Sequence, residues 1–184
     1  MTVNIPAGLE DHNLEIYRHR NTARAIYNGK TVNYLDLPEQ VREIYQAELI
    51  LNRKACKCLR ESMCITESDQ MEETYVACRY GALNYIPDLK RGKTTPDMPV
   101  CDEIETCPGF DIICMAPEGP GGRLARREFQ AAILIANGKL DKEIADEMGI
   151  KIPTLRTHIE RIREKLHVNN RIEIALWIHK QGTI

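Results

Sequence analysis

Four segments in the last third of the chain carry apolar residues at the helical spacing of three and four. Helices are predicted over 124–136, over 141–148, over 153–166, and from Asn169 or Asn170 to Lys180. Gly149 supplies the left-handed residue that a helix end needs before a sharp turn. Four helices with a tight turn between the second and the third are typical of a helix-turn-helix unit, whose third helix enters the major groove.

The hydrophobic pattern of the first 115 residues mixes strand and helix signals. Asn28 and Gly29 lie between two short β-prone runs, and this pair predicts a hairpin over 23–37. Helical spacing predicts one helix over 38–59 and a second over 66–80. Residues 86–122 have little periodicity and are predicted to form a loop. The fold class expected is therefore mainly α: a four-helix C-terminal domain and a small α+β, cysteine-rich N-terminal domain.

Charge and cysteine content change at the same place in the sequence. Residues 123–184 carry 12 Lys and Arg against 8 Asp and Glu, a net charge of +4, whereas residues 1–122 carry 13 against 19, a net charge of -6. All seven cysteines lie between Cys56 and Cys114. The stretch 116–122, "APEGPGG", has the composition of a linker. We therefore predict domains at 1–115 and 123–184, joined by 116–122.

The apolar content places the chain among globular proteins. Hydrophobic residues make up 43% and charged residues 28% of the sequence. No apolar run approaches the roughly 20 residues that span a membrane, and the N-terminus has no secretory pattern. We expect a cytoplasmic protein without membrane contact, in which the cysteines stay reduced.

Several short motifs of the C-terminal region occur in a family-specific order. They are Leu124, Arg127-Glu128, Gly138, "KEIA" at 142–145, Gly149-Ile150, "TLRTH" at 154–158, Ile162, "KLHV" at 165–168, Arg171 and Ala175. With these motifs residues 124–182 resemble the DNA-binding domain of LuxR-type regulators. Ala125 and Lys151 depart from the Thr and Ser usual in that family. A sigma-factor region-4-like module and a helical bundle with a merely solvated basic face are the alternatives.

The resemblance implies a DNA contact surface on the third helix, 153–166. The base-facing positions of the family correspond to Arg156, Thr157 and Glu160, and the apolar stripe of this helix leaves Arg163 on the same side. Arg binds a guanine edge, and Glu accepts from cytosine. Phosphate contacts are expected from Lys142, Thr154 and Lys165. The family also implies a homodimer through the fourth helix, with Leu176 and Trp177 as candidates for the contact.

A cysteine cluster precedes the basic region. Cys101, Cys107 and Cys114 lie within fourteen residues, and "CPG" at 107–109 is typical of a turn around a metal-bound sulfur. Four thiolates make a closed zinc site, and Cys78 is the predicted fourth ligand. A structural metal would also offset the entropy of ordering residues 86–122. An iron–sulfur cluster, buried packing and a redox role are the alternatives to Zn²⁺.

The remaining cysteines and the histidines indicate no catalytic site. Cys56, Cys58 and Cys64 are expected to pack, with Cys56 on the apolar stripe of its helix and Cys58 off it. The sequence has no Gly-rich phosphate loop, no Cys-x-x-Cys pair and no metal-spaced histidines. We therefore expect a DNA-binding transcriptional regulator that is not an enzyme. The alternative is a zinc-binding adaptor that docks on a protein such as RNA polymerase.

Overall fold

The computed structural model describes residues 5–20, 22–99, 101 and 103–181, and the chain divides into two compact units. Unit 1 comprises Met1–Cys101 and Cys107–Met115, and unit 2 comprises Asp102–Thr106 and Ala116–Thr183. None of the described helices is long and apolar enough to cross a membrane.

Unit 2 consists of four helices and a short hairpin. The helices are α4 (Arg126–Ala136), α5 (Asp141–Glu147), α6 (Ile152–Leu166) and α7 (Arg171–Lys180). The ends of these helices agree with the four predicted helices to within two residues. Asn170 caps α7, because its side chain accepts a hydrogen bond from the Glu173 N–H at 3.0 Å.

The hairpin of unit 2 lies in the stretch predicted as a linker. Strands β6 (Glu118–Gly119) and β7 (Gly122–Arg123) pair, and the Gly121 N–H donates to the Lys165 carbonyl at 2.8 Å. A Cβ on Gly119 would lie 2.4 Å from that same carbonyl oxygen. These glycines are therefore needed because two backbones approach closely, and not because the segment must be flexible.

A five-stranded antiparallel sheet forms the centre of unit 1. Its order is β3-β2-β1-β4-β5. The strands are β1 (Leu14–His19), β2 (Thr22–Tyr27), β3 (Lys30–Asn33), β4 (Leu89–Lys90) and β5 (Lys93–Thr94). The predicted hairpin is present as β2 and β3, with Asn28 and Gly29 at positive φ of 50° and 73°. The sequence prediction missed β1 and the two short strands within the expected loop.

The helices of unit 1 correct the prediction of one long helix over 38–59. This segment forms α1 (Glu39–Leu51), α2 (Arg53–Lys57) and a π-helix, η2 (Cys58–Ser62). The break occurs at Asn52, whose backbone N–H closes α1 while its side chain accepts from the Ala55 N–H at 3.1 Å. The next helix, α3 (Ser68–Arg79), begins two residues later than predicted.

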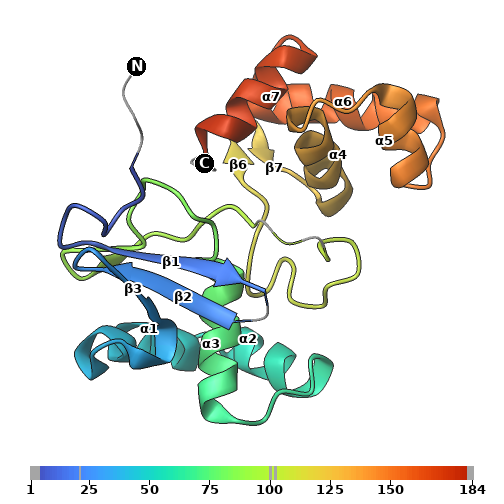
Figure 1. Ribbon diagram of the computed structural model, residues 1–184. Helices are drawn as coiled ribbons and strands as arrows, with labels where there is room; N and C mark the ends of the chain where they lie inside the picture. Colours follow the sequence, from blue (N-terminus) through green and yellow to red (C-terminus); the bar gives the residue numbers. More distant parts are fainter. Residues whose placement is uncertain (1–4, 21, 100, 102, 182–184) are drawn as a thin grey trace. The chain divides into compact units, whose positions relative to one another are not determined.

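The core of unit 1 lies between the sheet and these helices, which cover one face of the sheet (Figure 1). Tyr45 is fully buried there, with its ring centroid 6.0 Å from Tyr34 and 5.0 Å from Tyr80, both edge to face. Two glutamates accept hydrogen bonds from this aromatic layer. Glu72 accepts from Tyr34 at 2.8 Å and from Arg42, and Glu48 accepts from Tyr80 and from Arg79 at 2.7 Å.

Three carboxyl groups gather where β1 meets the segment 82–97. The Asn84 N–H donates to Glu15 at 2.5 Å, and the Asn84 side chain donates to Asp97 at 2.8 Å. The Ile16 N–H donates to Asp88 at 2.5 Å. Glu15 and Asp88 are 0% exposed, and each has one oxygen without a hydrogen-bond partner. Burial, together with the nearby carboxylates, raises the pKa of Glu15 to about 9 and that of Asp88 well above its usual range.

The carboxyl cluster predicts that unit 1 loses stability as the pH rises. Burial raises the pKa of Asp97 to about 7, so in the folded state it and Glu15 keep protons that the unfolded chain releases near pH 4. The contribution of these two groups to the free energy of unfolding should therefore be fully present below pH 4 and fall by about 3 kcal/mol or more up to pH 9. Urea unfolding monitored by tyrosine signals measures unit 1 selectively, because all seven tyrosines precede residue 86 and the single Trp lies in unit 2.

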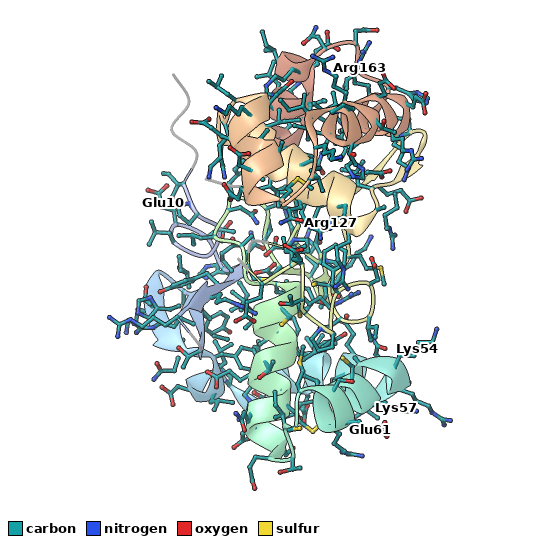
Figure 2. All side chains as sticks on the ribbon, turned by 90° about the vertical axis from the view of Figure 1, so that its right-hand side faces the viewer. Glu10, Lys54, Lys57, Glu61, Arg127 and Arg163 are labelled. Carbon is teal, nitrogen blue, oxygen red and sulfur yellow. The ribbon has the colours of Figure 1, made fainter. Side chains whose placement is uncertain are left out.

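The matched variants for this prediction are Glu15→Gln and Glu10→Gln. A glutamine at position 15 keeps an oxygen that can accept from the Asn84 N–H but does not titrate. The fall in the free energy of unfolding between pH 7 and 9 should therefore become smaller. Glu10 is exposed, and its substitution should leave the pH profile unchanged (Figure 2). A profile that is flat in the unsubstituted protein would contradict the prediction.

Candidate nucleic-acid interface and thiol cluster

Burial of one stripe determines which side of α6 faces solvent. Leu155 and Ile162 are 0% exposed, Leu166 is buried, and α6 packs against α4 and α5. The turn before α6 uses Gly149 at φ +63°, as predicted, and no atom lies within 4 Å of the position of its Cβ. Backbone conformation, and not a close approach, is therefore the reason for glycine at this position.

The side of α6 opposite its buried stripe carries the predicted base-facing residues. Arg156, Thr157, Glu160 and Arg163 are all exposed. The Thr157 hydroxyl donates to the Pro153 carbonyl at 3.2 Å, whereas Arg156, Glu160 and Arg163 have no hydrogen bond or ion pair with any described residue. Figure 2 shows Arg163 extending outward from α6. The structure thus brings these four positions together on one open helix face, with two guanidinium groups and one carboxylate available to a ligand.

The predicted phosphate contacts divide into two kinds. Lys142, next to the start of α5, and Thr154, in the first turn of α6, are exposed and have no hydrogen-bond or ion-pair partner among the described residues. Lys165 is only partly exposed, and its ammonium group lies 2.7 Å from the Glu128 carboxylate. Glu128 is 3% exposed. Lys165 therefore has a partner inside the domain and is less available to a phosphate than the sequence suggests.

The Glu128 carboxylate also explains how α4 begins without the usual capping hydroxyl at Ala125. The Ala125 N–H donates to Glu128 at 2.8 Å, so a residue inside the first turn satisfies this backbone group. Burial raises the pKa of Glu128, but the hydrogen bonds from Lys165 and Ala125 outweigh burial, and the pKa is lowered overall. One carboxylate thus fixes the start of α4 and joins it to the end of α6.

Helix α7 carries apolar residues on more than one side. Ile174 and Ile178 are buried within unit 2, whereas Ile172 is 71% and Leu176 is 52% exposed. The two exposed residues are four positions apart and therefore share one helix face. Trp177, the other predicted dimer candidate, is partly buried within the unit. The helix thus has one apolar face inside the domain and a second, smaller one toward solvent.

The four predicted metal ligands lie in the same part of unit 1. Burial raises the pKa of Cys114 to about 12, and the thiols of Cys78, Cys101 and Cys107 contribute to this shift. Burial raises the pKa of Cys78 to about 11; Arg18 opposes the shift, and Cys107 and Cys101 add to it. Electrostatic interactions of this kind require that the four sulfur atoms be neighbours. The four thiols therefore influence one another in one part of unit 1, and the metal site itself stays a prediction.

The backbone between Cys107 and Cys114 forms a compact turn. The Phe110 N–H donates to the Cys107 carbonyl at 3.4 Å, the Ile113 N–H donates to Gly109 at 2.7 Å, and the Asp111 N–H donates to Cys114 at 2.8 Å. Arg18 donates to the Cys78 sulfur at 3.1 Å. Among the described residues, however, no three His, Cys, Asp or Glu side chains are already arranged to hold a metal ion. The thiols are neighbours without a formed coordination geometry.

The other three cysteines correct one detail of the sequence analysis. Cys58 belongs to the buried core, and the partly buried Cys56 packs against that core, with its thiol 3.1 Å from the Leu49 carbonyl; the correction therefore concerns Cys58 alone. The prediction had placed Cys56 on the apolar stripe and Cys58 off it. The break at Asn52 and the π-helix that follows rotate the chain relative to one continuous helix. Cys64 is exposed and has a positive φ of 57°.

Comparison with known proteins identifies the C-terminal region. Residues 123–178 match the family model described as bacterial regulatory proteins, luxR family. The transcriptional regulatory protein LiaR of Bacillus subtilis (strain 168) is 43% identical over 65 residues, which are 35% of this chain and 31% of that protein. DesR of the same strain is 52% identical over 59 residues, 32% of this chain and 30% of that protein. UhpA of Escherichia coli (strain K12) is 38% identical over 65 residues, 35% and 33% of the two chains.

These matches confirm the resemblance found in the sequence: the C-terminal region is a LuxR-type helix-turn-helix domain. The chain matches about a third of the length of these regulators. No solved structure matches the chain significantly.

Proposed function

We propose that this protein regulates transcription by binding double-stranded DNA through its LuxR-type helix-turn-helix domain. The observation that carries the proposal is the open face of α6, where two arginines and a glutamate have no partner among the described residues. The names of the matched relatives, which are transcriptional regulatory proteins, support the same function. In this proposal α6 enters the major groove.

The side chains of α6 suit the reading of base edges. Arg156 presents a fork of N–H donors that fits the two acceptors of guanine, and Glu160 accepts from the amino group of cytosine. Arg163 lies two turns along α6 from Arg156, so both guanidinium groups are on the same side of the helix. Thr157 lies beside them with its hydroxyl already bound to the backbone, which leaves its methyl group for a thymine methyl.

Phosphate contacts fix the position of the domain on the duplex. Lys142 and Thr154 lie near the starts of α5 and α6, where unpaired backbone N–H groups also attract anions. Lys165 serves the fold instead, through its ion pair with Glu128. The phosphate contacts expected from this domain are therefore those of Lys142 and Thr154.

Base and phosphate contacts predict different effects of substitution. Arg156→Ala should weaken binding to the preferred duplex by about 5- to 150-fold and relax the preference at one base pair. Lys142→Gln should weaken binding to all sequences about equally and reduce the slope of log affinity against log salt by about 1. Selection of duplexes from a random library, followed by fluorescence anisotropy with the full chain, measures both effects.

Lys180→Gln is the matched control, since it removes one exposed cation from the end of α7 and should leave both quantities unchanged. Absence of duplex binding at low salt would contradict the proposal. A helical unit that docks on a protein, such as RNA polymerase, would then be the better explanation.

We also propose that the protein is a homodimer that uses α7. The exposed pair Ile172 and Leu176 forms an apolar strip that a two-fold axis can pack against its own copy. Two copies of α6 related by such an axis would read two half-sites of a symmetric operator.

Leu176→Glu should therefore yield a monomer without loss of stability, because this side chain is half exposed in the single chain. Leu140→Glu is the control, since Leu140 is 68% exposed but precedes α5. Analytical ultracentrifugation of the three proteins tests the proposal. A monomer before substitution, or equal dissociation by both variants, would contradict the assignment of α7.

We propose further that Cys78, Cys101, Cys107 and Cys114 bind a metal ion, with Zn²⁺ preferred and an iron–sulfur cluster as the alternative. Four sulfur donors suit these metals, and the compact turn after Cys107 together with the hydrogen bond from Arg18 to Cys78 supports the site. Small side-chain movements would have to complete the coordination, because no three ligands are in place. The bound ion would supply folding free energy to a segment with little regular structure.

Metal analysis of protein purified without oxygen tests this site. About one zinc per chain without a visible absorption band is expected, whereas iron and sulfide with a broad band would indicate the cluster. Cys114→Ser should abolish metal binding, and Cys64→Ser should leave it unchanged because Cys64 is exposed. Metal-free protein with all seven thiols titratable in the native state would rule out the site.

A further inference from the structure

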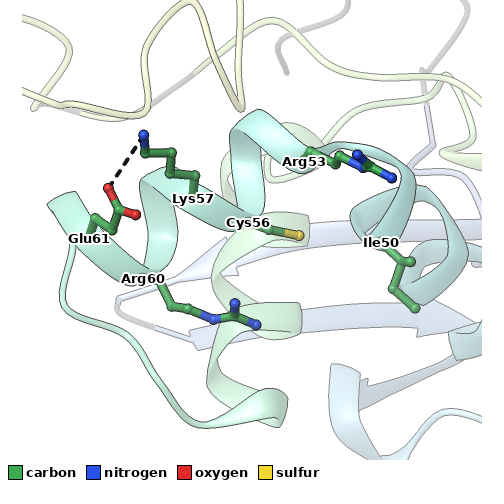
Figure 3. A pocket seen from close by; sticks show the side chains of 6 residues that line it. All are labelled: Ile50, Arg53, Cys56, Lys57, Arg60 and Glu61. Atoms are coloured by element: carbon green, nitrogen blue, oxygen red, sulfur yellow. Dashed lines mark ion pairs between the residues drawn. The ribbon is translucent and has the colours of Figure 1, made fainter.

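A pocket in unit 1 has a lining unlike that of any site described so far. Its cavity of about 490 Å³ is lined by Ile50, Arg53, Cys56, Lys57, Arg60 and Glu61. This volume lies in the range of cavities that hold small organic ligands. Figure 3 shows Arg53, Cys56 and Arg60 pointing the same way from α2 and η2, toward the side where Ile50 extends from α1. Lys57 points the other way, toward Glu61.

The two arginines of the pocket are available to a ligand. Arg53 and Arg60 are exposed and form no hydrogen bond or ion pair with described residues, whereas Lys57 pairs with Glu61 at 3.7 Å. Two guanidinium groups on one side of a concave surface are a natural arrangement for an oxyanion, which each can bind with two parallel N–H bonds.

The backbone around the pocket is also unusual. Asn52 separates α1 from α2, and this break places Ile50 opposite the arginines. The π-helix η2 then carries Arg60, with the Met63 N–H donating to the Cys58 carbonyl at 3.0 Å. Single π-turns are uncommon and frequently occur at functional sites. Both irregularities lie within the segment that lines the cavity.

The apolar residues at this place favour an organic ligand over a bare ion. Ile50 is 72% and Leu51 is 83% exposed, and Ile50 lines the cavity. Residues 53–60 hold four of the 13 basic residues of the first 122 positions and no acidic one, although that region has a net charge of -6. A long polyanion would meet the surrounding negative charge, whereas a small anion meets the two arginines, and the carboxylate in the lining, Glu61, is paired with Lys57.

We propose that this pocket binds a small organic anion, with a phosphate or carboxylate group held by Arg53 and Arg60 and an apolar part against Ile50. The proposal concerns unit 1 and does not depend on DNA binding by unit 2. Unit 1 would then be a domain that binds a small-molecule ligand.

Phenyl phosphate is a suitable probe because it combines an oxyanion with an apolar ring of the right size. Titration of the ¹⁵N-labelled full chain should shift the backbone amides of residues 50–61, and calorimetry should give the affinity. The double variant Arg53→Gln/Arg60→Gln should bind about tenfold or more weakly, because two charge-assisted contacts are lost. The substituted residues are exposed, so circular dichroism should show an unchanged fold.

Lys54→Gln is the matched control. Lys54 is an exposed cation of the same short helix that does not line the cavity, and it extends outward from α2 (Figure 2). Its substitution should leave the affinity unchanged. An equal loss in this control would show attraction by diffuse charge and overturn the proposal, as would shifts that lie outside residues 50–61 or no shift at all.

Two further titrations separate the sources of the anion. Inorganic phosphate should bind more weakly than phenyl phosphate; equal affinities would show that the apolar wall is not used and overturn the organic ligand. A DNA duplex that shifts the same amides and depends on Arg53 and Arg60 would overturn the small-molecule assignment in favour of nucleic-acid phosphates.

Discussion

Burial of the apolar stripe of α6 is the constraint on which the rest of unit 2 depends. Once Leu155 and Ile162 lie fully inside the domain, the arginines and the glutamate of this helix must face solvent. The buried Glu128 strengthens the arrangement because it holds Lys165 at the end of α6 and the backbone N–H of Ala125, just before α4, at the same time. The hairpin at 118–123 completes it through the hydrogen bond to the Lys165 carbonyl. The orientation of the helix face proposed to read DNA is thus fixed from three sides.

Unit 1, in contrast, buries several carboxyl groups. Glu72 and Glu48 each accept hydrogen bonds from a tyrosine hydroxyl and an arginine. Burial raises the pKa of Glu72, but the hydrogen bonds from Arg42, Gln46 and Tyr34 outweigh burial and lower the pKa overall, so this carboxylate stays ionised. Among the described residues no cation acts on Glu15 or Asp88, and each leaves one oxygen unpaired. Protonation is the remaining way to lower the cost of burying them. Glu72 therefore differs from Glu15 and Asp88 in its response to pH, although all three lie in one small domain.

The sequence predicted unit 2 better than unit 1 for physical reasons. Helices α4 and α6 have a strong apolar stripe, and Gly149 behaves as its position suggested. In unit 1 the stripe of 38–59 continues through Asn52, and only the side-chain hydrogen bond to Ala55 shows that the helix breaks there. The glycines at 119 and 121 looked like a linker because composition cannot distinguish flexibility from a close approach of backbones. Likewise, the pairing of Lys165 with Glu128 joins residues 37 positions apart, which no local pattern reveals.

Two pairs of exposed arginines have no partner among the described residues, and their surroundings favour different ligands. Arg156 and Arg163 stand on a convex helix of a region with a net charge of +4, where the field of the whole domain adds to the local contact. Arg53 and Arg60 line a concave site in a region with a net charge of -6, where the field beyond the pocket opposes a polyanion. A DNA duplex needs attraction over many phosphates, whereas a small anion needs only one enclosed contact. Shape and regional charge therefore favour separate roles for the two pairs.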